Sequence, residues 1–341
     1  MSKSKINFLE IGSRKIGPNK PTFIIAEAGI NHNGDMELAK QMVDEAAKCD
    51  VDAIKIQTLL PEELFSKKLN SEIYDYIQTL SFNKKQHIEL KKRAEKNGIE
   101  FLSTPVGSNT AKLLNEIKCN AFKIASGELN NLELVSQIAK YGKPIIVSTG
   151  MSTLSEIITT IETIQEHNCP FAILHCISCY PTKTNDANLS TIPYFQSIFD
   201  APIGYSDHTL GNQACLTAVA LGAKILEKHF TLDKNMEGPD QKLSGDIHDF
   251  KELVIETRKV EKSMGIPRTK PYSPEIKFKN LMRVSIGTSK NITSGTKITK
   301  SMLTYFRPGT GIPPTLINQI IGLRINQDVE KGTHLTWNML S

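Results

Sequence analysis

The chain has 341 residues, of which 39% are hydrophobic and 23% charged, and this ordinary globular composition excludes disordered and fibrous classes of protein. A net charge of +5 is too small to indicate nucleic acid or a membrane surface as a partner, and no apolar run is long enough for a membrane span or a secretion signal. We therefore predict a cytoplasmic protein. Because one hydrophobic core rarely covers this length, we expect a large domain followed by a small one.

Eight short apolar segments recur along the first 230 residues. Most are continuous apolar runs, which is typical of parallel strands buried on both faces. In chain order they are FIIAEAG (23–29), AIKIQTL (53–59), EFLSTPV (100–106), AFKIASG (121–127), PIIVSTG (144–150), FAILHCI (171–177), APIGYSD (201–207) and KILEKHF (224–230).

Amphipathic segments lie between these runs. In DMELAKQMVDEAAKC (35–49), apolar residues recur on one helical face and Asp35 stands at the start. Eight alternations of strand and helix within about 250 residues predict an α/β fold of the (β/α)₈ TIM-barrel type. A doubly wound open sheet is the alternative, but no GxGxxG follows the first strand. The other helical patterns cover 83–97, 108–117, 131–140, 154–167, 211–222 and 247–264.

The pattern changes after residue 265. The segment GIPRTKPYSPEIK (265–277) holds three prolines and no clear period, which indicates a linker. Further on, NITSGTKITKSML (291–303) and DVEKGTHLTWNML (328–340) match each other at one offset, which indicates pseudo-two-fold symmetry. We therefore predict a barrel domain, a linker and a small β-rich domain, over 1–265, 266–281 and 282–341.

Each predicted strand begins apolar and ends polar. Any single Ser or Thr there could cap the next helix. The active site of a TIM barrel lies at the C-terminal ends of its strands, however, so eight converging polar ends favour an active site. They are Glu27, Lys55-Gln57-Thr58, Ser103-Thr104, Ser126, Ser148-Thr149, His175, Ser206-Asp207-His208 and Lys228-His229.

Two histidines at the ends of adjacent predicted strands are candidate metal ligands. His208 follows the seventh strand and His229 ends the eighth, so both imidazoles could reach one ion. Two nitrogen ligands leave positions open for water or substrate, which is typical of a catalytic divalent site. Glu27 and Asp240 are candidate carboxylates beside it. The alternative is a pair of packing or capping histidines.

Lys55 and Lys123 project from predicted barrel strands. A lysine in such a place could form a Schiff base or anchor a phosphate. Because the two lysines are accompanied by the hydroxyl groups of Ser126, Ser148 and Ser206, the sequence favours a phosphorylated anion as the ligand.

Six cysteines are scattered along the chain, and several lie in apolar runs, so we expect buried thiols and no disulfides. Cys176 and Cys179 have the spacing of half a zinc clamp. No second pair follows them, so we interpret both as structural.

Together, the motifs resemble those of the sialic acid synthase family. The resemblance extends in order over nearly the whole chain, and the tail resembles an antifreeze-like (SAF) domain. It implies condensation of phosphoenolpyruvate with an N-acetylated hexosamine such as N-acetylmannosamine, which yields phosphate and a nine-carbon 2-keto sugar acid. It also implies a divalent ion, Mn²⁺ or Mg²⁺ and alternatively Co²⁺, and a homodimer in which one subunit's SAF domain covers the other's barrel. The matching motifs are IIAEAGINHNGD, IKIQT, FLSTP, FKIASGE, STGM, GYSDHT, EKHFTLDKNMEGPD and FRPGTGI.

The resemblance also implies a role for individual residues. His208 and His229 would hold the metal, and Glu27 would be the acid or base near the sugar aldehyde. Phosphoenolpyruvate would be held by Lys55, Lys123, Ser126, Ser148 and Ser206. The sugar would contact Gln57, Glu128, Tyr180 and Asp240, together with Arg307 supplied by the partner subunit.

The identity of the acceptor sugar stays open between several alternatives. EKHFTLDKNMEGPD also resembles synthases that act on 2,4-diacetamido sugars and make legionaminic acid, and the 60–80 segment around Asn70 departs from the neuraminate-making pattern. The rival functions are a related synthase with a phosphorylated aldose acceptor, a Schiff-base aldolase, and a non-catalytic ice- or sugar-binding protein. An SAF tail disfavours the first, borohydride trapping with pyruvate would reveal the second, and a tail active without the barrel would reveal the third.

Overall fold

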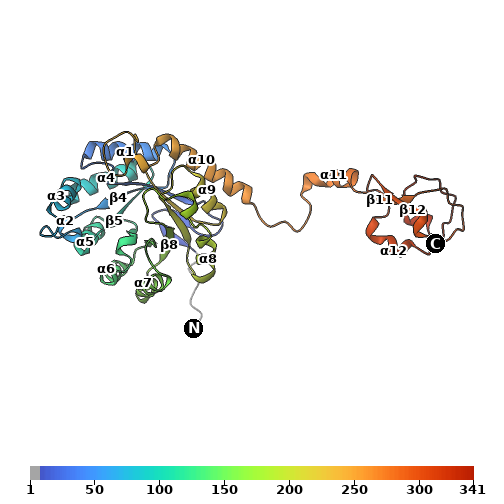
Figure 1. Cartoon of the computed structure of the whole chain (residues 1–341), viewed down its shortest axis with the longest axis horizontal. Coiled ribbons are helices and arrows are strands. Elements are labelled where there is room, and N and C mark those ends of the chain that lie inside the picture. Colours follow the sequence, from blue (N-terminus) through green and yellow to red (C-terminus); the bar gives the residue numbers. More distant parts are fainter. Residues whose placement is uncertain (1–7) are drawn as a thin grey trace. The chain divides into compact units, whose positions relative to one another are not determined.

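A computed structural model describes residues 8–341 and divides the chain into two compact units between Gly265 and Ile266. In the first unit, helices surround a sheet of eight parallel strands (Figure 1). None of the helices in the described range is long and apolar enough to cross a membrane.

The eight strands predicted from the apolar runs are confirmed. They pair in the order β5-β4-β3-β10-β9-β8-β7-β6, and β5 lies against β6, so the sheet closes into a TIM barrel. The strands are β3 (Phe23–Gly29), β4 (Ala53–Thr58), β5 (Glu100–Pro105), β6 (Phe122–Ile124), β7 (Ile145–Ser148), β8 (Phe171–Cys176), β9 (Ile203–Asp207) and β10 (Ile225–His229).

The predicted amphipathic helices are also present, and several begin at a capping side chain. Asp35 accepts hydrogen bonds from the backbone N–H groups of Glu37 and Leu38, which starts the first helix at Met36. The outer faces of the strands pack against these helices in one continuous core. The helices are α1 (Met36–Lys48), α4 (Lys84–Lys96), α5 (Ser108–Glu116), α6 (Leu132–Ala139), α7 (Leu154–Glu166), α9 (Gln213–Ala220) and α10 (Ile247–Met264).

Several elements were not predicted. Helices α2 (Pro61–Leu64) and α3 (Ser71–Leu80) lie between β4 and α4, and α8 (Thr191–Ile198) follows β8. An antiparallel hairpin, β1 (Leu9–Ile11) with β2 (Arg14–Ile16), precedes the barrel.

The hairpin covers the barrel interior at the N-terminal ends of the strands, which we call the base of the barrel. Its buried Leu9, Ile11 and Ile16 pack in one cluster with inward-facing strand residues such as Phe23 and Ile25. Successive side chains of a strand point to opposite faces, so Glu27, two places after Ile25, also faces inward. The interior is therefore apolar at its base and becomes polar towards the C-terminal ends of the strands.

The second unit contains a helix where the sequence pattern indicated only a linker. Helix α11 (Ser273–Met282) occupies part of 266–281, and none of its residues is buried. The predicted β-structure follows as β11 (Ser285–Thr288) paired with β12 (Leu303–Phe306), several single bridges and the short helix α12 (Ile317–Ile320).

The internal sequence repeat of the second unit has a structural counterpart. Ile292 and Val329, which occupy equivalent places in the two copies, form an antiparallel bridge with each other. Each copy ends in a 3₁₀ turn, over Lys300–Met302 and Trp337–Met339.

The six cysteines are free thiols, as expected, and all but Cys179 are buried.

Candidate active site

A cavity of about 230 Å³ lies at the C-terminal ends of the barrel strands, where the sequence predicted the active site. Strand alternation explains its polar lining, because Glu27 and Lys55 stand two residues beyond the inward-facing Ile25 and Ala53. The predicted residues that line it are Glu27, Lys55, Gln57, Lys123, Ser126, Ser148, Tyr180, Ser206, His208 and His229.

The sequence interpretation missed one central residue, Glu227. Its carboxylate lies 3.8 Å from the Nζ atom of Lys55 and 3.7 Å from that of Lys123, and it accepts a hydrogen bond of 3.3 Å from the Ser206 hydroxyl. Glu227 precedes His229 by two places on β10, so the two share one face of the strand. That spacing is the signal that places Glu227 in the cavity, whereas the sequence analysis counts only Lys228 and His229 as the polar end of this strand.

The charged groups of the cavity form a connected network. The Lys55 ammonium lies 2.6 Å from the Glu27 carboxylate and donates a 3.0 Å hydrogen bond to the Thr104 hydroxyl. The Lys123 ammonium donates to the carbonyl oxygen of Ile124 at 3.1 Å. Lys55, Lys123 and Glu27 are each at most 3% exposed.

Burial shifts the pKa values in this network in different directions. It raises the pKa of Glu27 to about 7, and the nearby Lys55 opposes this shift only in part. Burial would raise the pKa of Glu227 as well, but Lys123 and Lys55 hold it below its ordinary value. At neutral pH, Glu27 is therefore only partly ionised, whereas the pKa shifts of Glu227 and Lys55 both favour their charged forms. Burial lowers the pKa of Lys123, so an anionic ligand would favour its charged form.

Hydroxyl groups add unused hydrogen-bonding capacity. The Ser148 hydroxyl is buried and has no hydrogen-bond partner within residues 8–341. A buried polar group without a partner is unfavourable by about 1–3 kcal/mol, and a bound oxygen-rich ligand would satisfy it. The neighbouring Ser126 hydroxyl, by contrast, has partners already: it accepts from the backbone N–H of Gly150 at 3.0 Å and hydrogen-bonds to the Cys176 side chain.

The two candidate metal ligands lie side by side, with ring centroids 5.4 Å apart. The Nδ1 atom of His208 is 2.8 Å from the carbonyl oxygen of Ile177, so Nδ1 carries a proton and Nε2 is the nitrogen left for a ligand. Burial alone would lower the pKa of His208, but its contact with Cys176 raises it, so a metal would displace a proton from Nε2. The buried Nδ1 of His229 has no hydrogen-bond partner in the described chain and lies 3.5 Å from Asp240. Burial lowers the pKa of His229 to about 3, so its ring is neutral and can bind a metal.

These two imidazoles fit a divalent ion held by two protein nitrogens with other positions open. Within residues 8–341, no group of three or more His, Cys, Asp or Glu side chains is arranged to hold a metal by itself. The remaining positions would be left to water or substrate.

Three predicted sugar contacts lie outside the cavity lining. Asp240 lies beside His229, in a small adjoining pocket with Tyr180. The Glu128 carboxylate accepts a hydrogen bond from the Asn131 side chain at 3.1 Å. Arg307 belongs to the second unit, where its guanidinium donates to the carbonyl oxygen of Met282 at 2.8 Å.

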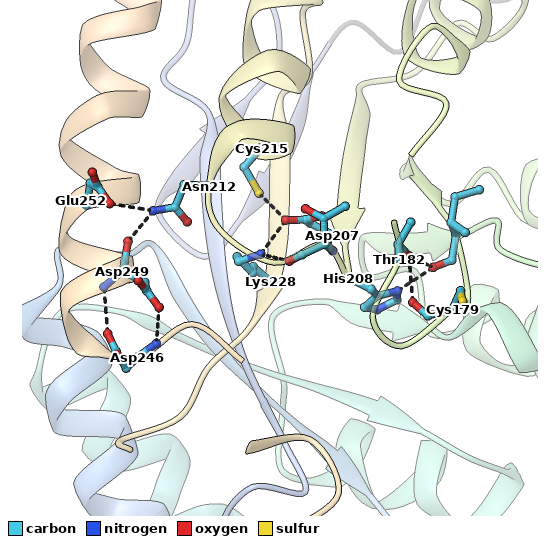
Figure 2. Close-up of polar contacts among 12 residues, drawn as sticks. Cys179, Thr182, Asp207, His208, Asn212, Cys215, Lys228, Asp246, Asp249 and Glu252 are labelled. Carbon is cyan, nitrogen blue, oxygen red and sulfur yellow. Dashed lines mark hydrogen bonds and ion pairs between the residues drawn. The ribbon is translucent and has the colours of Figure 1, made fainter. Parts of the chain in front are cut away.

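Several polar strand ends face the helices and not the cavity. Lys228 forms an ion pair with Asp207 under α9 (Figure 2). His175 bonds to the carbonyl oxygen of Ala187, and Thr58 bonds to His87 and Ser103. Cys176, for which the sequence predicts a structural role, also lines the cavity.

Comparisons with known proteins identify the family. A family model described as the NeuB family matches residues 42–269, and a model of the SAF domain matches residues 283–341. The chain belongs to the NeuB family. The family predicted from the motifs is therefore confirmed, as are the barrel and the SAF domain.

The NeuB-family relatives include named enzymes. N,N'-diacetyllegionaminic acid synthase of Campylobacter jejuni is 39% identical over 318 residues, which cover 89% of this chain and 95% of the relative. Human N-acetylneuraminate-9-phosphate synthase is 34% identical, with 93% and 92% covered. The structure of an N-acetylneuraminic acid synthetase from Leptospira borgpetersenii, in complex with citrate, is 40% identical with a TM-score of 0.77, covering 81% of this chain and 97% of that one. This NeuB-family chain is an enzyme, a synthase.

Proposed function

We propose that this NeuB-family synthase condenses phosphoenolpyruvate with an N-acetylated amino sugar and releases phosphate and a nine-carbon 2-keto sugar acid. The observation that carries the proposal is the pair of buried lysines, Lys55 and Lys123, on either side of Glu227 and close to the two histidines. The acceptor that we favour is a 2,4-diacetamido hexose, because the segment EKHFTLDKNMEGPD resembles the synthases that make legionaminic acid and the Campylobacter legionaminic acid synthase is 39% identical. N-acetylmannosamine is the alternative, since the N-acetylneuraminic acid synthetase from Leptospira is 40% identical.

The lysine pair supports phosphoenolpyruvate as the donor substrate. Hydrogen bonds between ammonium groups and a phosphate dianion are charge-assisted and roughly twice as strong as neutral ones. The Ser148 hydroxyl, which lacks a partner in the described chain, would donate to the same anion. Burial lowers the pKa of Lys123, and a bound dianion would favour its charged form again.

The reaction joins C3 of phosphoenolpyruvate to the aldehyde carbon of the open-chain sugar. Positive charge then develops at C2, water adds there, and the C2–O bond breaks to release phosphate. Lys55 and Lys123 would hold the donor so that C3 faces the aldehyde, which makes the reaction effectively unimolecular. Glu27, with a pKa of about 7, can supply a proton to the aldehyde oxygen as it becomes a hydroxyl group.

We further propose that His208 and His229 hold a divalent ion, Mn²⁺ or Mg²⁺. When bound there, such an ion supplies Lewis-acid polarisation of the sugar aldehyde. The free Nε2 of His208 and the unpartnered Nδ1 of His229 support this role.

The test is to incubate the pure protein and Mn²⁺ with phosphoenolpyruvate and a panel of acceptors. The panel holds N-acetylmannosamine, 2,4-diacetamido hexoses, their phosphorylated forms and simple phosphorylated aldoses. We expect phosphate release and a nine-carbon keto acid, measured by mass spectrometry, with a diacetamido sugar, and loss of both on chelation that Mn²⁺ reverses. Turnover only with a phosphorylated aldose, or borohydride trapping of pyruvate on a lysine, would contradict the proposal. Full turnover in chelator would contradict the metal role alone.

A further inference from the structure

Lys228 lies on β10 between two residues of the cavity but points away from it. Glu227 and His229 face the barrel interior, whereas the Lys228 side chain, 3% exposed, lies on the outer face of the strand towards β9 and α9. Its ammonium group lies 2.6 Å from the Asp207 carboxylate and donates to the carbonyl oxygen of Thr209 at 2.8 Å (Figure 2).

These contacts fix the backbone on both sides of His208. Asp207 accepts a 2.8 Å hydrogen bond from the backbone N–H of Thr209, and its other oxygen accepts from the Cys215 thiol on α9 at 3.2 Å. Lys228 thus bonds to the residue before His208 and to the residue after it, while its own backbone adjoins His229.

A second set of contacts holds His208 from the β8 side. The backbone N–H of Thr182 donates to the carbonyl oxygen of His208 at 2.9 Å. The carbonyl oxygen of Ile177 accepts a hydrogen bond from Nδ1–H of His208 and another, of 2.9 Å, from the backbone N–H of Cys179. The ring position of His208 therefore depends on both sets of contacts.

We propose that the Lys228–Asp207 ion pair is a positioning pair, which sets the separation of the His208 and His229 imidazoles so that both can bind one divalent ion. This inference rests on the metal role in the proposed function. A buried ion pair adds little net stability, because desolvation offsets the attraction between its charges. The pair joins the two strands that carry the imidazoles, and residues that orient metal ligands in this way typically change metal affinity by about 10- to 100-fold when they are replaced.

The test is the double variant Asp207→Asn/Lys228→Met. It removes both charges together, so no unpaired charge is left buried, and Asn keeps an oxygen for the Thr209 N–H. The matched control is Asp52→Asn/Arg258→Met, an ion pair of 3.5 Å at the opposite end of the barrel. Circular dichroism checks that both variants fold, and electron paramagnetic resonance follows the binding of Mn²⁺ alone.

We expect roughly 10- to 100-fold weaker Mn²⁺ binding in the first variant and unchanged binding in the control. Equal losses in the two variants, or wild-type affinity in the first, would overturn the proposal.

A metal-free measurement separates this inference from the proposed function. In metal-free wild-type protein labelled with ¹⁵N at histidine, long-range NMR spectra should show His208 protonated at Nδ1, as its bond to Ile177 requires. We expect a mixture of tautomers in the first variant and the wild-type tautomer in the control. A wild-type protein that binds no Mn²⁺ would contradict the metal role, and unchanged His208 spectra in the first variant would contradict the positioning.

Discussion

At the scale of single residues, the two buried carboxylates of the cavity differ in their ionisation. Glu227 is held ionised by the two lysines, while burial keeps Glu27 partly protonated at neutral pH. The two carboxylates therefore suit different tasks, one to fix the ammonium groups and the other to exchange a proton. Glu227 lies within 3.8 Å of both lysine ammonium groups, where it can orient them.

Lys123 provides the sharpest test of the donor half of the site. Lys123→Ala removes a charge-assisted contact, so we expect the KM for phosphoenolpyruvate to rise by roughly 10- to 150-fold, or about 1.5–3 kcal/mol. The KM for the sugar should stay within a few-fold. Steady-state kinetics with each substrate varied in turn measures both, and Lys112→Ala, at an exposed position of α5, is the control. A larger effect on the sugar would reverse the assignment of the two half-sites.

His32 predicts how the stability of the protein depends on pH. Its ring is fully buried and stacks on Phe82 at 4.3 Å, and burial lowers its pKa from 6.5 to about 4. Between these values the unfolded chain binds more protons, so the contribution is complete above pH 6.5 and is lost as the pH falls towards 4. Over that window the loss amounts to about 3 kcal/mol.

The variant His32→Gln carries no titrating group at this position. We expect its free energy of unfolding, measured by urea denaturation, to fall less steeply between pH 6.5 and 4 than that of the wild type. His248→Gln, on the exposed surface, should keep the wild-type slope. Parallel curves for wild type and His32→Gln would show that His32 does not titrate in this window.

Most of the cavity residues could be predicted from the sequence because polar groups at the ends of buried strands are conspicuous. The sequence pattern did not separate the inward-facing ends from the outward-facing ones. The sequence analysis misses Glu227 and groups Lys228 with the site. Glu227 lies two places before His229 and so faces the same side of β10, whereas the adjacent Lys228 faces the opposite side. The partners that orient His208, such as Ile177, act through backbone atoms, and no residue type signals such contacts.

At the scale of elements, prediction succeeded where burial imposes a pattern. All eight barrel strands were found because both of their faces are buried, which requires continuous apolar runs. Helix α11 buries none of its residues, so no apolar stripe marks it. Helix α8 has only eight residues and includes Pro193, and the strands of the hairpin have three residues each, too few to show a period.

The hairpin nevertheless makes a testable contribution to stability. Ile11→Ala leaves a cavity in the packed base of the barrel, and we expect the protein to lose about 2–5 kcal/mol of unfolding free energy. Because the site lies at the other end of the barrel, kcat and both KM values should be unchanged at temperatures where the variant is folded. The control is Lys15→Ala, at an exposed position of the same hairpin, which should change neither the unfolding free energy nor the kinetic constants. A change in KM for Ile11→Ala would show that the base and the site are coupled.

At the scale of the whole molecule, the open prediction is the homodimer in which Arg307 serves the partner's barrel. Arg307→Ala and Glu27→Ala should each be nearly inactive alone. If the SAF domains are swapped, mixing the two after partial unfolding restores about a quarter of all sites when exchange is random. Phosphate release measures the recovery, and mass spectrometry confirms that heterodimers have formed. Heterodimers without recovered activity would show that Arg307 does not act across the dimer.

The closure of the barrel has a consequence for its synthesis. Strand β3 pairs with β10, so Phe23 meets Ile225 only after nearly the whole first unit has been translated. At the usual 5–20 residues per second, the ribosome needs roughly 10–40 s to cover that interval. Until then one edge of β3 has no partner, and Ile11 of the hairpin lacks the inner wall formed by Leu174 and Ile225. The hairpin that covers the base of the barrel is translated before the strand that completes its apolar surroundings, so its burial is completed only once β10 has been made.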